Sequence, residues 1–114
     1  MTTFKVLNKN KIYLRLKVSP QQLEEFCQQH QIAELALFGS VLRDDFNENS
    51  DIDLLVSYQL TAKRGLLVKI VMIEELKELF KREVDLVSKK AIEKSNNWIR
   101  RQNILNSAEV IYVA

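Results

Sequence analysis

Apolar residues along the 114-residue chain follow two spacings, one typical of strands and one typical of helices. Compact apolar runs predict four short strands, at residues 33–38, 51–58, 83–87 and 109–113. Apolar residues at helical spacing predict a long helix over residues 66–81 and a last helix from Ser95 to Asn106. Because strands and helices alternate, the pattern predicts an α/β or α+β domain with a sheet of about four strands.

The N-terminal segment differs from the rest of the pattern. Apolar side chains alternate at Ile12, Leu14 and Leu16, which predicts a short edge strand or an ordered arm. We therefore divide the chain into an arm, residues 1–18, and a domain, residues 19–114.

The predicted domain begins with a helix start signal. Ser19 is a suitable N-cap, Pro20 suits the first helical position, and Gln22 completes a capping box. These three residues predict a helix that begins at Pro20.

Composition narrows the class of protein. Hydrophobic residues make up 46% of the chain and charged residues 28%, which favours one folded domain. A formal net charge of +2 gives no reason to expect a nucleic acid or a membrane as partner. A single cysteine, no signal-peptide pattern and a longest apolar run broken by Lys69 favour a soluble, cytoplasmic protein.

Two aspartates interrupt the second apolar run. Side chains alternate across a strand, so Asp51 and Asp53 share one face and Ile52 and Leu54 share the other. The two carboxylates would stand about 6–7 Å apart and would repel by about 2–3 kcal/mol at an effective dielectric of about 20. A divalent cation offsets this repulsion, and Mg²⁺ accepts paired oxygen ligands. The pair predicts a magnesium site; the alternative is edge-strand carboxylates that face water.

A third carboxylate, Asp85, lies in the next apolar run, between Val84 and Leu86. If the two strands are neighbours, Asp85 can lie beside Asp51 and Asp53. Three carboxylates on adjacent strands predict a two-metal site that holds an attacking oxygen and a nucleotide phosphate.

A Gly-Ser pair follows the first predicted strand. Gly39 and Ser40 precede one helical turn, so backbone N–H groups there can face an anion. Glycine permits the close approach of a phosphate, and the Ser40 hydroxyl adds a donor. A Gly-Ser pair is also common in tight turns. It indicates a phosphate site here because Asp51 and Asp53 follow it in the chain.

The Gly-Ser pair is followed, after ten residues, by the motif "DID". This spacing resembles the signature of the nucleotidyltransferase superfamily that includes DNA polymerase beta. The stretch "FGSVLRDDFNENSDIDLLV" is most similar to the minimal nucleotidyltransferases, which usually accompany a HEPN protein as a toxin–antitoxin pair. The resemblance extends over roughly residues 33–113. It implies the nucleotidyltransferase fold, a mixed sheet with helices packed mainly on one face.

The resemblance also implies roles for five residues. Gly39 and Ser40 would bind the β- and γ-phosphates of ATP, and Asp51 and Asp53 would hold two magnesium ions. Asp85 would complete one metal site and help to deprotonate the incoming hydroxyl.

The segment after the Gly-Ser pair matches the family less closely. Arg43 stands where the family often has an arginine and could contact phosphate, although pairing with Asp45 is an equal alternative. Asp45 matches a common acidic position. Asp44 is a departure, since many members have glycine there, and it puts the conformation of the loop in question.

The implied reaction is the attack of a hydroxyl on the α-phosphate of ATP, with pyrophosphate as the leaving group. Positioning and charge neutralisation supply most of the catalysis in such transfers. The resemblance implies AMP transfer to a hydroxyl, plausibly of a tyrosine, on a HEPN toxin, which makes this chain its antitoxin. Two alternatives stay open: a small hydroxylated acceptor, and an antitoxin that neutralises its partner by contact alone.

Other conspicuous residues have structural interpretations. Cys27 lies on the apolar face of its helix and is expected to be buried. The single histidine, His30, is expected as a cation at a helix C-terminus. Trp98 is expected in the core. The run "LLVKIVMI" (66–73) has more apolar surface than one helix of a small domain usually buries, and it is either core under the N-terminal arm or an interface.

Overall fold

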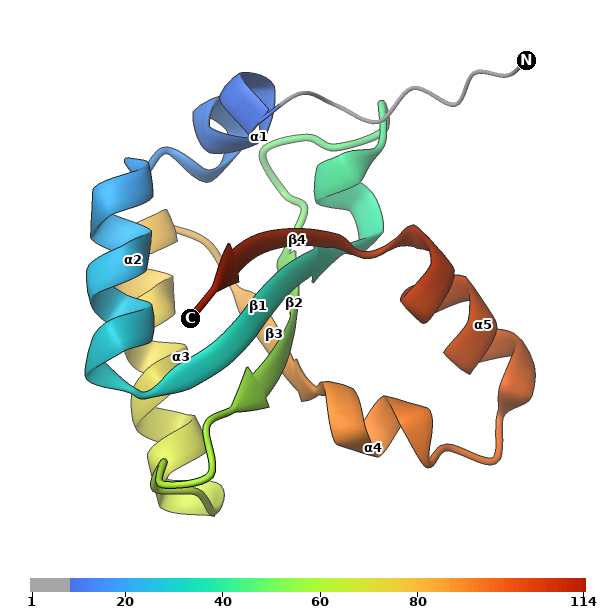
Figure 1. Cartoon of the computed structure of the whole chain (residues 1–114). Helices are drawn as coiled ribbons and strands as arrows, with labels where there is room; N and C mark the ends of the chain where they lie inside the picture. The colour runs from blue at the N-terminus through green and yellow to red at the C-terminus, as the bar shows by residue number, and fades with distance from the viewer. Residues whose placement is uncertain (1–8) are drawn as a thin grey trace.

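A four-stranded sheet in the order β3-β2-β1-β4 forms the centre of the fold (Figure 1). The computed structural model describes residues 9–114. The strands are β1 (Ile32–Phe38), β2 (Ile52–Tyr58), β3 (Val84–Ser88) and β4 (Glu109–Val113). β1 pairs antiparallel with β2 and with β4, whereas β2 pairs parallel with β3. The predicted mixed sheet of four strands is confirmed.

Helices cover both faces of the sheet. The larger group comprises α1 (Lys9–Leu16), α2 (Pro20–Gln29) and α3 (Leu66–Phe80), which pack on one face. Helices α4 (Lys89–Glu93) and α5 (Trp98–Ser107) pack on the other face, beside one end of the sheet (Figure 1). A 3₁₀ turn, η1 (Gly39–Leu42), follows β1 directly. Most of the helical residues therefore lie on one face, as predicted.

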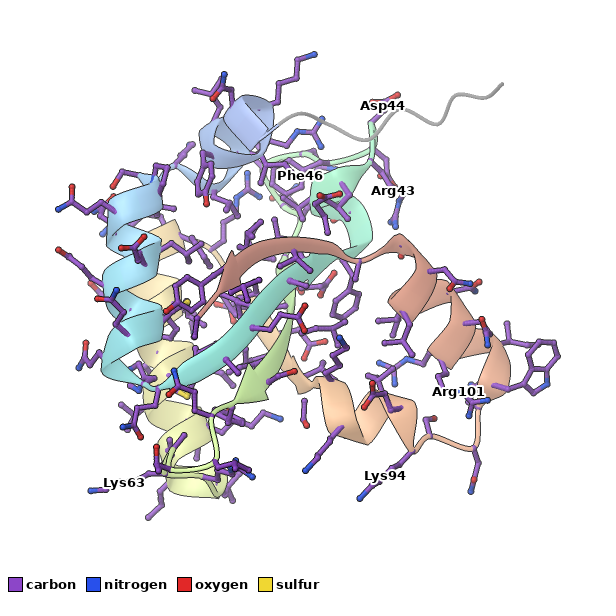
Figure 2. All side chains as sticks on the ribbon, in the orientation of Figure 1. Arg43, Asp44, Phe46, Lys63, Lys94 and Arg101 are labelled. Atoms are coloured by element: carbon purple, nitrogen blue, oxygen red, sulfur yellow. The ribbon has the colours of Figure 1, made fainter. Side chains whose placement is uncertain are left out.

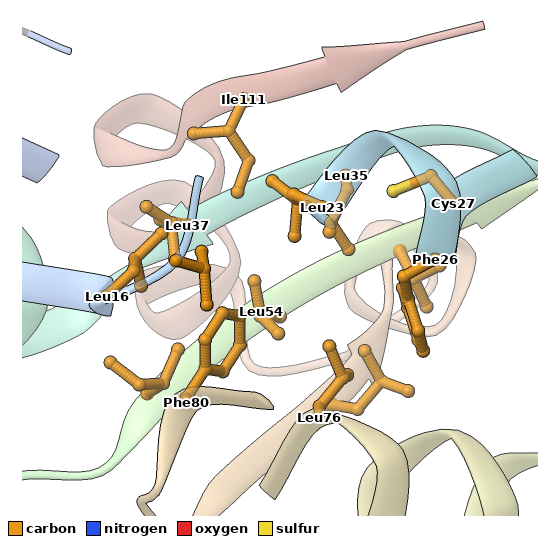
Figure 3. Packing of buried hydrophobic residues seen from close by; sticks show 14 of the residues in the cluster. Leu16, Leu23, Phe26, Cys27, Leu35, Leu37, Leu54, Leu76, Phe80 and Ile111 are labelled. Carbon is orange, nitrogen blue, oxygen red and sulfur yellow. The ribbon is translucent and has the colours of Figure 1, made fainter. Parts of the chain in front are cut away.

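Strand alternation divides the core into two clusters. Leu35 and Leu37 of β1 and Leu54 of β2 face the larger group of helices and are fully buried (Figure 3). Ala36 and Phe38 face the opposite way and pack with Ile92 of α4 and Ile104 of α5. Because β1 buries residues on both faces, its second half, residues 35–38, is a continuous apolar run.

The start of α2 follows the predicted capping box. The Ser19 hydroxyl accepts a hydrogen bond from the Gln22 amide, at 3.1 Å. The Gln22 side chain in turn accepts one from the Ser19 amide, at 2.9 Å. With Pro20 at the first helical position, the signal is local and complete, and the helix begins where the sequence predicts.

The prediction of an edge strand before α2 is wrong for residues 9–16, which form α1. Ile12 and Leu16 are buried in the main core, while Leu14 is 75% exposed. Residues four apart share one face of a helix and also one face of a strand, so two buried positions fit both patterns. The exposure of Leu14 distinguishes them. The rest of the predicted arm, residues 1–8, lies outside the described residues.

The C-terminal helix also differs from prediction. A separate helix, α4, begins directly after β3, where the Ser88 hydroxyl accepts a hydrogen bond from the Ala91 amide. The last helix begins at Trp98, with Asn97 rather than Ser95 as its N-cap. Trp98 is 62% exposed and is not a core residue, because Ile104 is the residue of α5 that packs on the sheet.

Helices α2 and α3 of the larger group contact each other through His30. This residue is the C-cap of α2, and its Nε2 atom lies 2.8 Å from Oε2 of Glu75 on α3. Cys27, one turn earlier, is buried as predicted, and burial raises the pKa of its thiol to about 12. The thiol is therefore protonated at neutral pH and acts as a packing residue.

Much of the apolar surface of α3 is exposed. Leu66, Leu67, Ile70 and Val71 keep between 47% and 78% of their surface accessible in the described part of the chain. Only Met72, Leu76 and Phe80 of this helix are fully buried. Among residues 9–114, no helix is both long and apolar enough to cross a membrane.

Two residues of α5 provide a test of this packing. Ile104→Ala should lower the free energy of unfolding by about 2–4 kcal/mol, because it leaves a cavity against the sheet. Trp98→Ala should change it by less than about 0.5 kcal/mol, because the indole is mostly in water. Urea unfolding of both variants measures the difference, and a larger loss for Trp98→Ala would contradict the position of α5.

Candidate active site

The end of β1 approaches the start of β2 at Gly39. This residue has a φ of +79°, a conformation that L side chains rarely adopt. A Cβ atom here would overlap Oδ2 of Asp53 and would lie 3.1 Å from its Cγ. Glycine is therefore required both by the backbone and by the neighbouring carboxylate. The backbone of the Gly-Ser turn lies directly against Asp53 as a result.

Strand register brings a second aspartate to the same place. Asp53 lies opposite Phe38 of β1 and opposite Asp85 of β3. The condition on which the prediction for Asp85 depends, that the second and third strands are neighbours, is met, and Asp85 stands beside Asp53. Asp53 is half-buried, whereas Asp51, one residue before β2, and Asp85 are exposed.

These carboxylates repel one another. Burial raises the pKa of Asp53 above its ordinary value, and the negative charges of Asp85 and then Asp51 raise it further. Arg43 is near enough to lower this pKa, but the net shift is upward. Asp53 therefore lies in a negative field that the protein does not neutralise, as expected for residues that bind a cation.

The donor set suits Mg²⁺, although the side chains are not gathered into a closed site. Within residues 9–114, no group of three or more Asp, Glu, His or Cys side chains stands ready to hold a metal ion. Asp53 and Asp85 are paired in register, while Asp51 precedes the strand. All three offer hard carboxylate oxygens, the ligands that Mg²⁺ takes. The exposed Asp51 and Asp85 are on the surface, where a change of rotamer costs little.

Arg43 lies at the surface near the site and pairs with a neighbouring loop residue. Its Nε atom lies 3.2 Å from Oδ1 of Asp45, and both side chains are more than half exposed. Figure 2 shows Arg43 and Asp44 at the end of η1, on the molecular surface. The pairing of Arg43 with Asp45 is thus observed, and such an exposed pair contributes little to stability. Contact between Arg43 and a phosphate stays a prediction.

Two arginines that the sequence pattern does not single out contact the loop between η1 and β2. Arg15 of α1 donates hydrogen bonds to the carbonyls of Val41 and Arg43. Arg82, just before β3, donates to carbonyls near the other end of this loop. No local signal could reveal these contacts, because each joins residues between 26 and 35 positions apart.

Comparison with known proteins identifies the family. The sequence model for the nucleotidyltransferase domain matches residues 19–111. A relative from Methanocaldococcus jannaschii, provisionally named a protein adenylyltransferase, is 33% identical over 70 residues, which are 60% of this chain and 68% of the relative. A second relative from the same organism, also provisionally named a protein adenylyltransferase, is 32% identical over 91 residues. The match covers 71% of this chain and 79% of that relative.

Solved structures share the fold. One, provisionally described as a minimal nucleotidyltransferase, has a TM-score of 0.63 at 28% identity. The match covers 87% of this chain and 93% of the neighbour's chain. A toxin–antitoxin complex with AMP-PNP has a TM-score of 0.65 at 16% identity, with coverage of 85% and 75%. A tri-AMPylated HEPN toxin of Shewanella oneidensis with its MNT antitoxin gives 0.56 at 14% identity, with coverage of 83% and 70%. The last two likenesses show the fold alone.

The family match begins before α2 and ends within β4, so it includes the Gly-Ser turn and the strands that carry Asp53 and Asp85. The chain therefore belongs to the nucleotidyltransferase domain family.

Proposed function

We propose that this chain is a magnesium-dependent protein adenylyltransferase, which transfers AMP from ATP to a hydroxyl of a partner protein. The observation that carries the proposal is the close approach of Gly39 to the Asp53 carboxylate. A nucleotide phosphate on the Gly-Ser turn would lie next to the carboxylates that hold its counter-ions. Membership of the nucleotidyltransferase domain family supports the transfer chemistry.

The chain would bind the nucleotide through the turn after β1. Backbone N–H groups near Gly39 and the Ser40 hydroxyl are donors for the β- and γ-phosphates. Two magnesium ions would be held by Asp51, Asp53 and Asp85. When bound, they supply the positive charge that neutralises the phosphates in the transition state.

The transfer itself requires a base for the incoming hydroxyl. The hydroxyl oxygen forms a bond to the α-phosphorus, and the bond from that phosphorus to the pyrophosphate oxygen breaks. A carboxylate oxygen of Asp85 would take the hydroxyl proton, and its exposure lets it pass the proton to water. Pyrophosphate leaves with the electron pair, so the step needs no covalent enzyme intermediate.

We propose a HEPN toxin as the partner and a hydroxyl, plausibly of a tyrosine, as the acceptor. The names of the Methanocaldococcus relatives support a protein as the acceptor of AMP. Fold neighbours solved as toxin–antitoxin complexes support a toxin as the partner. One of those complexes contains a tri-AMPylated HEPN toxin. The chain would then act as an antitoxin that silences its toxin by covalent modification.

The first test follows label from ATP marked at the α-phosphate. The partner that co-purifies from the native host is stripped of AMP and incubated with this chain and Mg²⁺. Asp53→Asn should slow label transfer by about 100-fold or more, because it removes one charged ligand from the reacting centre. Asp44→Asn, an exposed loop aspartate, is the matched control and should keep the rate. Equal transfer by Asp53→Asn would contradict the proposed chemistry.

Two glycine variants separate the approach to Asp53 from backbone strain. Both Gly39 and Gly65 have positive φ, but only a Cβ at Gly39 meets Asp53, since nothing lies within 4 Å of one at Gly65. Each alanine variant should lose about 1–2 kcal/mol of stability from the unfavourable backbone. Only Gly39→Ala should also slow AMP transfer, by about 100-fold, because it displaces the site. A comparable loss of transfer in Gly65→Ala would show that strain alone explains the effect.

Repulsion between Asp53 and the neighbouring carboxylates of Asp85 and Asp51 should lower the free energy of unfolding. In a metal-chelating buffer at pH 7, Asp53→Asn should raise the unfolding free energy by up to about 1 kcal/mol, a value limited by solvent screening. The folded chain binds its Asp53 proton more tightly than the unfolded chain, so wild-type stability falls as pH rises through the raised pKa. The gain in Asp53→Asn should therefore vanish below pH ~4. Thermal unfolding measures both; a variant less stable at pH 7 would contradict the repulsion.

A further inference from the structure

We propose that Arg15 and Arg82 are positioning residues that clamp the loop between η1 and β2, residues 43–51, around Phe46. The clamp fixes the Gly39–Ser40 turn relative to Asp51 and Asp53. Its role in catalysis rests on the proposed function, whereas its geometry does not.

Arg15 holds the beginning of the loop. Its Nη1 atom donates to the carbonyl of Val41 at 2.8 Å and to that of Arg43 at 2.5 Å. Val41 is a fully buried residue of η1, one position after Ser40. The guanidinium of Arg15 is therefore hydrogen-bonded to the turn that carries the proposed phosphate donors. Hydrogen bonds from a charged donor are stronger than neutral ones.

Arg82 holds the end of the loop. Its Nη1 atom donates to the carbonyls of Asn47 and Ser50, both at 2.8 Å. Ser50 immediately precedes Asp51. The adjacent Glu83 carbonyl accepts a hydrogen bond from the amide of Ile52, at 3.0 Å. Arg82 and its neighbour therefore bind both sides of Asp51.

The position of Arg82 follows from the end of α3. Lys81 caps the helix in a left-handed conformation, with a φ of 58°, and turns the chain toward β3. Arg82 then stands three residues before Asp85. A single side chain thus connects the strand that bears Asp85 with the loop that leads to Asp51 and Asp53.

Phe46 joins the two arginines. The Arg82 guanidinium carbon lies 4.2 Å from the centre of the Phe46 ring, and that of Arg15 lies 5.3 Å from it. Both distances are within the range of cation–π contact. Phe46 is the only large apolar residue in the polar stretch "RDDFNENSD", and it packs against the main core (Figure 2). The ring therefore anchors an otherwise polar loop between two cations.

This arrangement gives α1 a role in the site. Among residues 9–114, other hydrogen bonds of the loop, such as those of Asn47 and Asn49, are made within it. Its acidic residues Asp44, Asp45 and Glu48 are exposed. Two arginines that bind four carbonyls hold both of its ends. Without them, the Gly-Ser turn and the aspartates would remain on their strands but would lose the fixed connection that orders Asp51.

The test measures amide hydrogen exchange in the full-length chain by NMR. Four loop amides, those of Arg43, Asn47, Asn49 and Ser50, donate hydrogen bonds within the loop region. In Arg82→Lys their exchange should be about tenfold faster, the effect of losing roughly one charge-assisted hydrogen bond. Amides of β1 and β2 should exchange as in the unmutated chain. The same variant should slow AMP transfer by about tenfold or more through kcat.

Arg64→Lys is the matched control. Arg64 also donates to a backbone carbonyl, that of Gln59 at 2.8 Å, and lies over an aromatic ring, that of Tyr58 at 5.6 Å. These contacts are at the opposite end of β2, so this variant should leave loop exchange and AMP transfer unchanged.

Each other outcome overturns a defined part of the account. Unchanged exchange of the loop amides in Arg82→Lys would refute the clamp. Faster exchange of amides throughout the sheet would show that Arg82 stabilises the whole fold and does not act on the loop in particular. Faster loop exchange with unchanged transfer would refute the positioning role. If the unmutated chain transfers no label while the exchange results hold, the clamp stands and the proposed function fails.

Discussion

The contact between the backbone of Gly39 and the carboxylate of Asp53 is the constraint on which the candidate site depends. It forces a glycine with positive φ at the end of β1, and it places the turn that follows against the start of β2. The parallel pairing of β2 with β3 then adds Asp85 to the same end of the sheet. Burial and like charge make this place unfavourable for an unneutralised carboxylate. A cation would offset the negative field, and a phosphate would accept hydrogen bonds from the exposed backbone donors, so the proposed metal and nucleotide would share one site.

Much of the fold could be predicted because its signals are local. The capping box at Ser19 and the strands at β1 and β2 are determined by neighbouring residues, and all were expected. The paired aspartates could be interpreted because alternation along a strand places them on one face. Asp85 could be named as a candidate from its apolar setting, but its place beside Asp53 depended on strand order, which the pairing of β2 with β3 supplies.

What could not be predicted depends on tertiary contacts. In α1, two buried positions fit a strand as well as a helix, and only packing on the core decides between them. Trp98 is large and apolar, yet α5 presents Ile104 to the sheet instead. Arg15 and Arg82 contact the loop across long separations in sequence, so no periodicity or motif marks them. A resemblance based on the motif alone likewise leaves out α1, although α1 holds the loop through Arg15.

The most direct test of the central claim is an NMR titration of the ¹⁵N-labelled chain with Mg²⁺ and AMP-PNP, an analogue of ATP. If the turn and the aspartates form one metal–nucleotide site, the amide signals of Gly39, Ser40, Asp53 and Asp85 should move together and should saturate only when both ligands are present. If these signals stay in place, or if the largest shifts occur near Tyr58 and Arg64 at the opposite end of β2, the claim is contradicted.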